Sequence, residues 1–379
     1  MNNIFQAVIL CGGYGTRIKK FTRYTPKSLI KFFDKNFIEY LIFYLSSFKI
    51  KEILLLIHYK QKLFRKLYHN KTFYGVKIKC IESKEALGTG GSIKIAEKFL
   101  QNYFLLCNGD TLFSINYSNF ISKIDKKKTI TTAYGIDFVS KKQKSSGNYI
   151  INRNKIFREI KEFHGSKFSL EKDLIPLIKN KKKRIFKNDY IDIGSYKGIN
   201  YASLWIKKNI FRKFVIFDRD GVFNLDKGYV YKKNDFLWNK NIFLFLKYLN
   251  RKKYLIFIVT NQSGIGRGYY SINQFYDLNK WMLKVLSKKE VFIDEIFFSP
   301  YYKSSKNNQF KKGKKFRKPS TGFFDLIKKK YPIEMKDSFV VGDKLTDKLF
   351  SKNIGLRYFQ VSRNSDILKI LHYLKKNEK

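Results

Sequence analysis

Two aspartates, Asp218 and Asp220, stand one residue apart directly after the apolar run from Phe214 to Phe217, and a glycine follows them. One carboxylate of such a pair can attack a phosphorus atom while the other moves a proton. Because side chains alternate along a strand, residues two apart share one side of the chain. The same residues also fit an ordinary strand followed by an Asp-Gly turn, so the spacing alone leaves both interpretations open.

The apolar run predicts a buried strand that delivers both carboxylates to the edge of a parallel sheet. In such α/β proteins, ligands bind beyond the carboxyl ends of the strands. Two later apolar runs also end in polar residues: Tyr254 to Val259 precedes Thr260, and Phe339 to Val341 precedes Gly342 and Asp343. Parallel pairing is therefore expected to bring these side chains to one edge.

The order of these segments resembles the motifs of the haloacid dehalogenase phosphatase superfamily. Asp218-Arg-Asp-Gly221 is similar to the first motif, and Thr260-Asn-Gln-Ser-Gly264 is similar to the second motif of the histidinol-phosphate and heptose-bisphosphate phosphatase branch. The resemblance implies an aspartyl-phosphate mechanism and a Mg²⁺ site. It assigns catalysis to Asp218, Asp220, Thr260 and Lys318, substrate contacts to Asn261 and Arg317, metal binding to Asp218, Asp343 and the backbone carbonyl of Asp220, and support of Lys318 to Asp347.

The resembled branch has a zinc loop of cysteines and a histidine ahead of an Arg-Lys-Pro element. Here the corresponding stretch, from Ser299 to Phe316, has Ser, Tyr, Lys or Phe at the ligand positions. None of these side chains makes a soft tetrahedral site. We therefore expect a phosphatase that uses Mg²⁺ and no zinc.

The first half begins with a second chemical motif, a glycine-rich loop after an expected strand from Phe5 to Leu10. Such a loop lets backbone N–H groups approach phosphate oxygens, and nearby cations add to the attraction. The candidate phosphate-binding residues are Gly12, Gly13, Gly15 and Thr16, with Arg17 and Lys27 as the catalytic cations.

A carboxylate also follows the apolar run from Phe104 to Cys107, since Asn108-Gly-Asp110 comes next. An acid at a strand end beside bound phosphates suits Mg²⁺. The glycine-rich loop and Thr25-Pro-Lys-Ser28 together resemble the signature of the Rossmann-like sugar-1-phosphate nucleotidyltransferases. The resemblance implies nucleotide binding by Gly88, Gly90 and Gly91, a Mg²⁺ site of Asp110 and Asp192, and contact of Glu171 with a hydroxyl of the acceptor sugar.

The first half departs from that family in one place. The family usually has a β-hairpin ending in a Glu-Lys pair and then an Asn-Ala-Gly strand, whereas Ser145 to Tyr149 stands here in place of that strand. The hairpin is expected to be shortened or missing. A domain that only binds a nucleotide therefore stays open as an alternative to an active transferase.

The length of 379 residues and the 44% hydrophobic content fit two globular domains. We expect two Rossmann-like, three-layer α/β domains: a nucleotidyltransferase domain over 1–210, closed by a helix from Tyr201 to Ile210, and a haloacid dehalogenase-like phosphatase domain over 211–379. Their glycine landmarks do not recur at a fixed period, which indicates a fusion of different domains rather than a duplication.

The formal net charge of +48 would suit a nucleic-acid-binding protein, and that alternative rests on charge alone. The basic residues are spread along the chain, and the aromatic residues lie mostly in apolar runs. We therefore expect neither nucleic acid nor a membrane as partner. The three cysteines lack disulfide spacing, and no basic leader or apolar stretch of roughly 18 residues is present, which predicts a cytoplasmic protein.

The motifs together predict a bifunctional enzyme of nucleotide-activated heptose synthesis for lipopolysaccharide. The second half resembles phosphatases of D-glycero-D-manno-heptose 1,7-bisphosphate, and the first resembles enzymes that transfer a nucleotidyl group, here expected to be GMP from GTP, to heptose 1-phosphate. The alternative is a phosphatase of another sugar or of histidinol phosphate, fused to a hexose-1-phosphate nucleotidyltransferase or to a decayed nucleotide-binding domain. The sequence leaves the anomer and the oligomeric state open.

Overall fold

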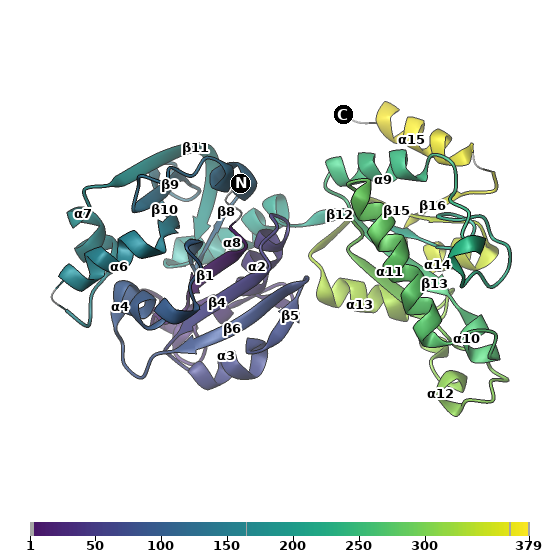
Figure 1. Cartoon of the computed structure of the whole chain (residues 1–379), viewed down its shortest axis with the longest axis horizontal. Coiled ribbons are helices and arrows are strands. Elements are labelled where there is room, and N and C mark those ends of the chain that lie inside the picture. Colours follow the sequence, from purple (N-terminus) through teal and green to yellow (C-terminus); the bar gives the residue numbers. More distant parts are fainter. Residues whose placement is uncertain (1–3, 164, 364, 378–379) are drawn as a thin grey trace. The chain divides into compact units, whose positions relative to one another are not determined.

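The computed structural model describes residues 4–163, 165–363 and 365–377. The chain divides into two compact units, Met1–Ile210 and Phe211–Lys379. Each unit has its own sheet with helices packed against it, so the expected α/β class is confirmed (Figure 1). None of the helices in the described ranges is both long and apolar enough to cross a lipid bilayer.

Unit 1 is built on a nine-stranded sheet in the order β5-β6-β4-β1-β7-β10-β9-β11-β8. Its strands are β1 (Gln6–Leu10), β4 (Glu52–Ile57), β5 (Lys71–Phe73), β6 (Val76–Glu82), β7 (Tyr103–Asn108), β8 (Thr111–Phe113), β9 (Ile130–Asp137), β10 (Gln143–Asn152) and β11 (Lys181–Asp192), and a separate pair joins β2 (Lys31–Phe32) to β3 (Lys35–Asn36). Because β1 pairs in parallel with β4 and β7, the residues that follow these three strands meet at one edge.

Helices cover both faces of this sheet. They are α1 (Lys19–Thr22), α2 (Phe37–Ser46), α3 (Gln61–Tyr68), α4 (Gly88–Ile95), α5 (Tyr117–Ser122), α6 (Arg153–Glu162), α7 (Ile175–Leu177) and α8 (Tyr196–Asn209). Val8 and Leu54 pack in one core with residues of α4 and α6. Ile9 and Leu55 alternate with them along the strands and are equally buried, so the opposite face is covered as well.

The β9–β10 pair lies where the sequence departs from its resembled family. These antiparallel strands are joined directly by residues 138–142, and their register shifts between Ser145 and Asn148. Every residue from 130 to 152 is described, and no second hairpin stands between the two strands. This arrangement agrees with the expectation that the hairpin is shortened or missing, and Ser145 to Tyr149 lies inside β10.

Unit 2 has five parallel strands in the order β14-β13-β12-β15-β16. They are β12 (Arg212–Phe217), β13 (Leu255–Asn261), β14 (Glu295–Ser299), β15 (Ile333–Gly342) and β16 (Arg357–Gln360). The helices are α9 (Ile242–Arg251), α10 (Ser263–Arg267), α11 (Ile272–Lys288), α12 (Asn308–Lys311), α13 (Gly322–Lys330), α14 (Leu345–Asn353) and α15 (Asp366–Lys376).

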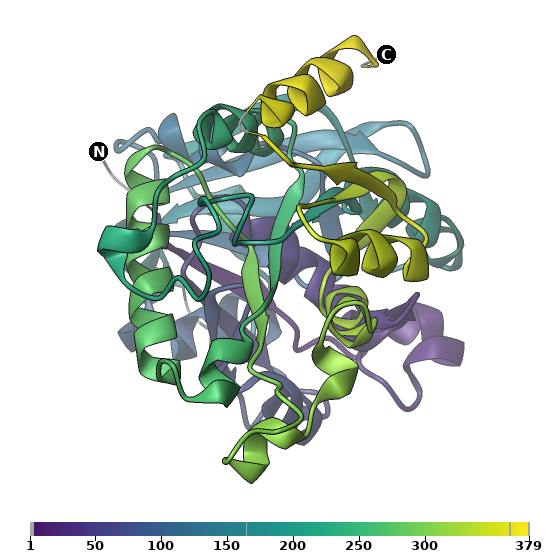
Figure 2. The same cartoon turned by 90° about the vertical axis from the view of Figure 1, so that its right-hand side faces the viewer.

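The central strand β12 is buried on both faces. Val215 and Phe217 belong to a core with apolar residues of α9, α11 and α15. On the other face, the ring of Phe214 lies 6.1 Å from that of Phe324 in α13. Figure 2 shows α11 and α13 on opposite sides of the strands of unit 2. Unit 2 is therefore the three-layer fold that the sequence predicted.

Two expected elements begin earlier in the structure. The helix expected from Tyr201 starts at Tyr196, because the Ser195 side chain caps it by accepting a hydrogen bond from Gly198 N at 3.0 Å. The strand expected from Phe339 starts at Ile333, since its first residues pair with Arg212 and Lys213 at the start of β12.

Candidate active sites

The first candidate site lies where three neighbouring strands of unit 2 end. Asp218 follows β12, Thr260 is near the end of β13, and Asp343 follows β15. Because β12 pairs in parallel with both other strands, these residues meet at one edge. A cavity of about 250 Å³ at this edge is lined by Asp218, Asp220, Thr260, Asn261, Gln262 and Arg317, among others.

Lys318 joins two carboxylates at this site. Its Nζ lies 3.0 Å from Asp218 Oδ2 and 2.5 Å from Asp347 Oδ1, and all three side chains are buried. Burial alone lowers the pKa of Lys318, but Asp218 and Asp347 outweigh burial and raise it. Burial also raises the pKa of Asp218, and Lys318 opposes that rise. The lysine thus keeps a positive charge beside a carboxylate that would otherwise repel a phosphate.

Asp220 is held firmly by its neighbours. Its carboxylate accepts hydrogen bonds from the fully buried Arg219 at 2.9–3.1 Å, from Asn224 Nδ2 at 3.1 Å and from Gln262 Nε2 at 2.8 Å. Gln262 Nε2 also donates to Thr260 Oγ1 at 2.8 Å, so the Thr260 hydroxyl accepts there and keeps its own proton for another acceptor. Arg219 and Gln262 were not predicted as site residues, although both stand inside the motifs that were recognised.

Three aspartates could hold a metal ion here. Within the described ranges, Asp218, Asp343 and Asp347 form the group of acidic side chains whose ligand atoms lie within 4.8 Å of one another. Asp347 is already engaged, because its second oxygen accepts a hydrogen bond from Lys344 N at 3.1 Å. Asp343 Oδ1 is buried with no hydrogen-bond partner among the residues described, and burial together with Asp218 raises the pKa of Asp343 to about 7. Such carboxylate oxygens fit a hard cation such as Mg²⁺.

Asn261 and Arg317 both line the cavity but differ in their contacts. The Asn261 amide makes two hydrogen bonds of 3.1 Å with the backbone of Lys318, donating to its carbonyl and accepting from its N–H. Arg317 donates to Tyr301 O at 3.3 Å and forms no ion pair with any acid in the described part of the chain. Burial and then Arg267 lower the pKa of Arg317. Arg317 therefore offers a cation that no acidic side chain of the described residues neutralises.

Aromatic side chains pack the stretch from Ser299 to Phe316 beside this cavity. The Tyr302 ring lies 3.9 Å from Arg267 Cζ, and the Phe316 ring lies 5.5 Å from that of Phe323. These contacts tie the stretch to the ends of α10 and α13.

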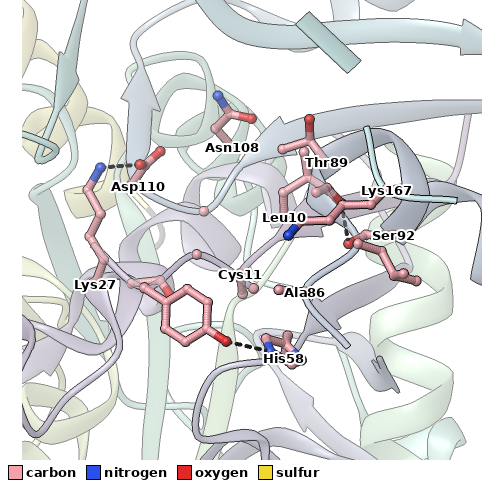
Figure 3. Close-up of a pocket in the computed structure, with 17 residues that line it drawn as sticks. Leu10, Cys11, Lys27, His58, Ala86, Thr89, Ser92, Asn108, Asp110 and Lys167 are labelled. Atoms are coloured by element: carbon pink, nitrogen blue, oxygen red, sulfur yellow. Dashed lines mark hydrogen bonds and ion pairs between the residues drawn. The ribbon is translucent and has the colours of Figure 1, made fainter. Parts of the chain in front are cut away.

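The second candidate site lies in unit 1, on a cavity of about 480 Å³ (Figure 3). Lys27 forms an ion pair with Asp110 and a second one, at 3.4 Å, with Asp192 Oδ1. Asp192 also accepts a hydrogen bond from Gly194 N at 2.5 Å. Burial and then Asp110 raise the pKa of Asp192, and Lys27 opposes that rise. A β-carbon on Gly194 would lie 2.9 Å from Arg17 Nη2, so both predicted cations border the two acids.

The residues predicted to bind the nucleotide and its phosphates divide into two groups. Gly12, Gly13 and Gly88 line the cavity, whereas Gly15, Thr16, Gly90 and Gly91 are not among the residues that line it. Gly15 has a left-handed backbone, with φ of 66°, at the start of the turn Thr16–Ile18. Gly90 and Gly91 are buried where α4 packs against residues 166–168. The Glu171 carboxylate accepts a hydrogen bond from Thr89 Oγ1 at 2.8 Å.

Tyr14 and His58 also line this cavity and were not predicted. The Tyr14 hydroxyl lies 2.9 Å from His58 Nε2, and His58 Nδ1 lies 3.0 Å from Ser83 O. Because a carbonyl only accepts, Nδ1 donates to Ser83 O, while the other ring nitrogen is paired with the Tyr14 hydroxyl. His58 could have been identified from its position in the sequence, because it directly follows β4, a parallel neighbour of β1.

Comparisons with known proteins match the two halves of the chain to two different families. One family model, described as Nucleotidyl transferase, matches residues 6–164, and another, described as Polynucleotide kinase 3 phosphatase, matches residues 213–362. The D-glycero-alpha-D-manno-heptose-1,7-bisphosphate 7-phosphatase of Campylobacter jejuni subsp. jejuni serotype O:2 is 41% identical over 135 residues, which are 36% of this chain and 73% of that protein.

Two further relatives are similar to this chain. The D-glycero-beta-D-manno-heptose-1,7-bisphosphate 7-phosphatase of Haemophilus ducreyi is 39% identical over 147 residues, 38% of this chain and 80% of that protein. The D-glycero-alpha-D-manno-heptose 1-phosphate guanylyltransferase of the same Campylobacter strain is 42% identical over 123 residues, 32% of this chain and 54% of that protein. This last match spans about half of the relative.

Proposed function

The chain belongs to the heptose-1,7-bisphosphate 7-phosphatase family through its second unit and has a nucleotidyl transferase domain in its first, and we propose that it performs two consecutive steps of nucleotide-activated heptose synthesis. The second unit removes the 7-phosphate of D-glycero-D-manno-heptose 1,7-bisphosphate. The first transfers GMP from GTP to the resulting heptose 1-phosphate. We infer the α anomer, because both Campylobacter relatives are named for it.

The observation that carries the phosphatase proposal is the buried bridge from Lys318 to Asp218 and Asp347. An Asp218 oxygen attacks the phosphorus, the bond from phosphorus to the sugar oxygen breaks, and Asp220 acts as the general acid that passes a proton to that oxygen. Asp220 then takes a proton from water, which attacks the aspartyl-phosphate and releases inorganic phosphate. The free proton of Thr260 binds a phosphoryl oxygen during both steps.

Three further residues support this reaction. Asn261 positions Lys318 through the two hydrogen bonds to its backbone, so we assign it an indirect role in substrate binding. Arg317, which has no acidic partner within the described ranges, binds the second phosphate of the substrate. Asp218, Asp343 and the backbone carbonyl of Asp220 would hold Mg²⁺, whose charge neutralises the phosphoryl oxygens.

In the first unit, the meeting of Lys27 with Asp110 and Asp192 supports nucleotidyl transfer. The two acids would hold Mg²⁺ beside the triphosphate. Lys27 and Arg17 bind phosphate oxygens, and Glu171 binds a hydroxyl of the acceptor sugar. An oxygen of the sugar phosphate attacks the α-phosphorus, and pyrophosphate leaves. Because the hairpin on the acceptor side is absent, we expect a high acceptor KM.

The test is to incubate the purified chain with Mg²⁺, either anomer of the heptose bisphosphate and each nucleoside triphosphate in turn. We expect phosphate release from the α anomer, followed by pyrophosphate and GDP-heptose when GTP is present. Release of phosphate without any nucleotide sugar would leave only the phosphatase and make the first unit a nucleotide-binding domain. Failure to release phosphate from both anomers would refute the phosphatase proposal.

A further inference from the structure

The loop that begins α4 is bonded to a segment about eighty residues later in the chain. Phe168 N donates to Leu87 O, and Gly90 N donates to Phe168 O, both at 3.0 Å. Leu170 N donates to Thr89 Oγ1 at 2.7 Å. The proposed nucleotide-binding loop, 87–91, is thus joined backbone to backbone with the segment that leads to the proposed acceptor residue, Glu171.

Glycine makes this close contact possible. Gly88 has a φ of +73°, and a β-carbon there would overlap the backbone of Phe168. A β-carbon on Gly90 would overlap the Phe168 ring, and one on Gly91 would lie 2.6 Å from Ser166 O. Phe168 itself is buried in the core of unit 1. The two segments therefore pack as one body, and neither can move far without the other.

The Thr89 hydroxyl is the side-chain link between them. It accepts from Leu170 N and donates to Glu171 Oε2 at 2.8 Å, so its single proton is used on the Glu171 carboxylate. Ser169 adds a weaker bond to the same oxygen at 3.3 Å. In Figure 3, Thr89 lies on the side of the cavity opposite Lys27 and Asp110. Thr89 therefore connects the cavity wall to the orientation of Glu171.

We propose that Thr89 is a positioning residue that couples the binding of the nucleoside triphosphate to the binding of the acceptor sugar phosphate. This inference rests on the proposed transferase function. Glycines make up three of the first four residues of α4, so the turn has little helical stability of its own and depends on its contacts. A nucleotide that orders the 87–91 loop also orders Glu171, and by linkage the sugar phosphate tightens the nucleotide by the same factor.

The experiment measures this factor by calorimetry on the full chain with Mg²⁺. The nucleotide is the α,β-methylene analogue of GTP, which cannot react because its α–β bridge is carbon, and the acceptor is heptose 1-phosphate. The dissociation constant of each is measured alone and in the presence of the other. The variants are Thr89→Val, which keeps the shape without the hydroxyl, and Thr89→Ser, which keeps the hydroxyl; Thr72→Val on the exposed strand β5 is the matched control.

We expect the parent, Thr72→Val and Thr89→Ser to show mutual tightening of about 5-fold or more, a usual size for coupled sites. In Thr89→Val the factor should fall towards one and the acceptor KM should rise, and Thr89→Ser should restore both. Unchanged coupling in Thr89→Val, or loss of analogue binding itself, would overturn the inference. A parent that makes no nucleotide sugar would instead refute the proposed transferase function. That result differs from a parent with normal turnover but no coupling, which would overturn only the inference about Thr89.

Discussion

Replacing Lys318 by methionine removes one positive charge while keeping a side chain of similar length. The lysine is 1% exposed and lies between Asp218, which is 7% exposed, and Asp347, which is 1% exposed. Because the two carboxylates raise the pKa of Lys318 above its ordinary value, the native protein carries this charge at neutral pH. The variant leaves two buried acids without their shared cation.

Two separate effects are expected from this variant, a loss of stability and a loss of phosphate release. Removing one partner of a buried ion pair typically costs about 3–5 kcal/mol, which a domain with about 5–15 kcal/mol of stability survives. Phosphate release should fall by about 10²–10³-fold, the usual loss when one preorganised group that stabilises developing charge is removed. The loss of phosphate release should persist when the lost stability is restored.

The double variant Lys318→Met with Asp347→Asn makes that separation. It removes one of the stranded charges, so most of the lost stability should return while phosphate release stays low. Stability is measured by urea unfolding in a Trp205→Phe background, where the fluorescence of Trp238 and Trp281 reports on the core of unit 2. Phosphate release from the heptose bisphosphate is measured on the same samples.

Release of phosphate by Lys318→Met at the parental rate would show that this cation has no part in catalysis. Recovery of activity together with stability in the double variant would show that Lys318 acts only by supporting the fold. Unchanged stability in the single variant would show that Asp218 and Asp347 do not depend on this cation.

Four further outcomes are expected. Asp218→Asn should abolish phosphate release, because an amide cannot form the aspartyl-phosphate, and calorimetric binding of GTP to unit 1 should be unchanged. Phosphate release should require added Mg²⁺ and resist zinc-selective chelators, and stoichiometric zinc in elemental analysis would contradict this. Asp110→Ala and Asp192→Ala should each lower pyrophosphate release by about 10²-fold or more, because each removes a charge that we propose to hold Mg²⁺; parental rates would refute the assignment. Burial raises the pKa of Asp294 to about 7, so the folded state keeps a proton that the unfolded state, with a pKa of ~3.9, gives up. Asp294 should therefore cost unit 2 up to about 4 kcal/mol of stability as the pH rises from 4 to 7, and Asp294→Asn should remove this part of the pH dependence in urea unfolding.

The local sequence was enough to predict that the candidate catalytic and metal-binding residues lie at the ends of strands. An apolar run followed directly by a carboxylate or hydroxyl placed Asp218, Thr260 and Asp343 at strand ends, and the structure has them there. This works because parallel strands end at one edge of the sheet, so a local pattern repeated along the chain implies a meeting in space. His58 could have been found from the same pattern, since it too follows a buried strand.

Only the tertiary structure decided which polar groups meet one another. Lys27 and Asp192 are 165 residues apart and approach because β11 returns beside β9 and β8. Asn261 turns its amide to the backbone of Lys318, and the Thr89 hydroxyl reaches Glu171. Spacing along a strand specifies the side on which a residue lies but not its partner. Partners are set by long-range packing, which brings distant donors and acceptors together and leaves each buried group to bond with what lies within reach.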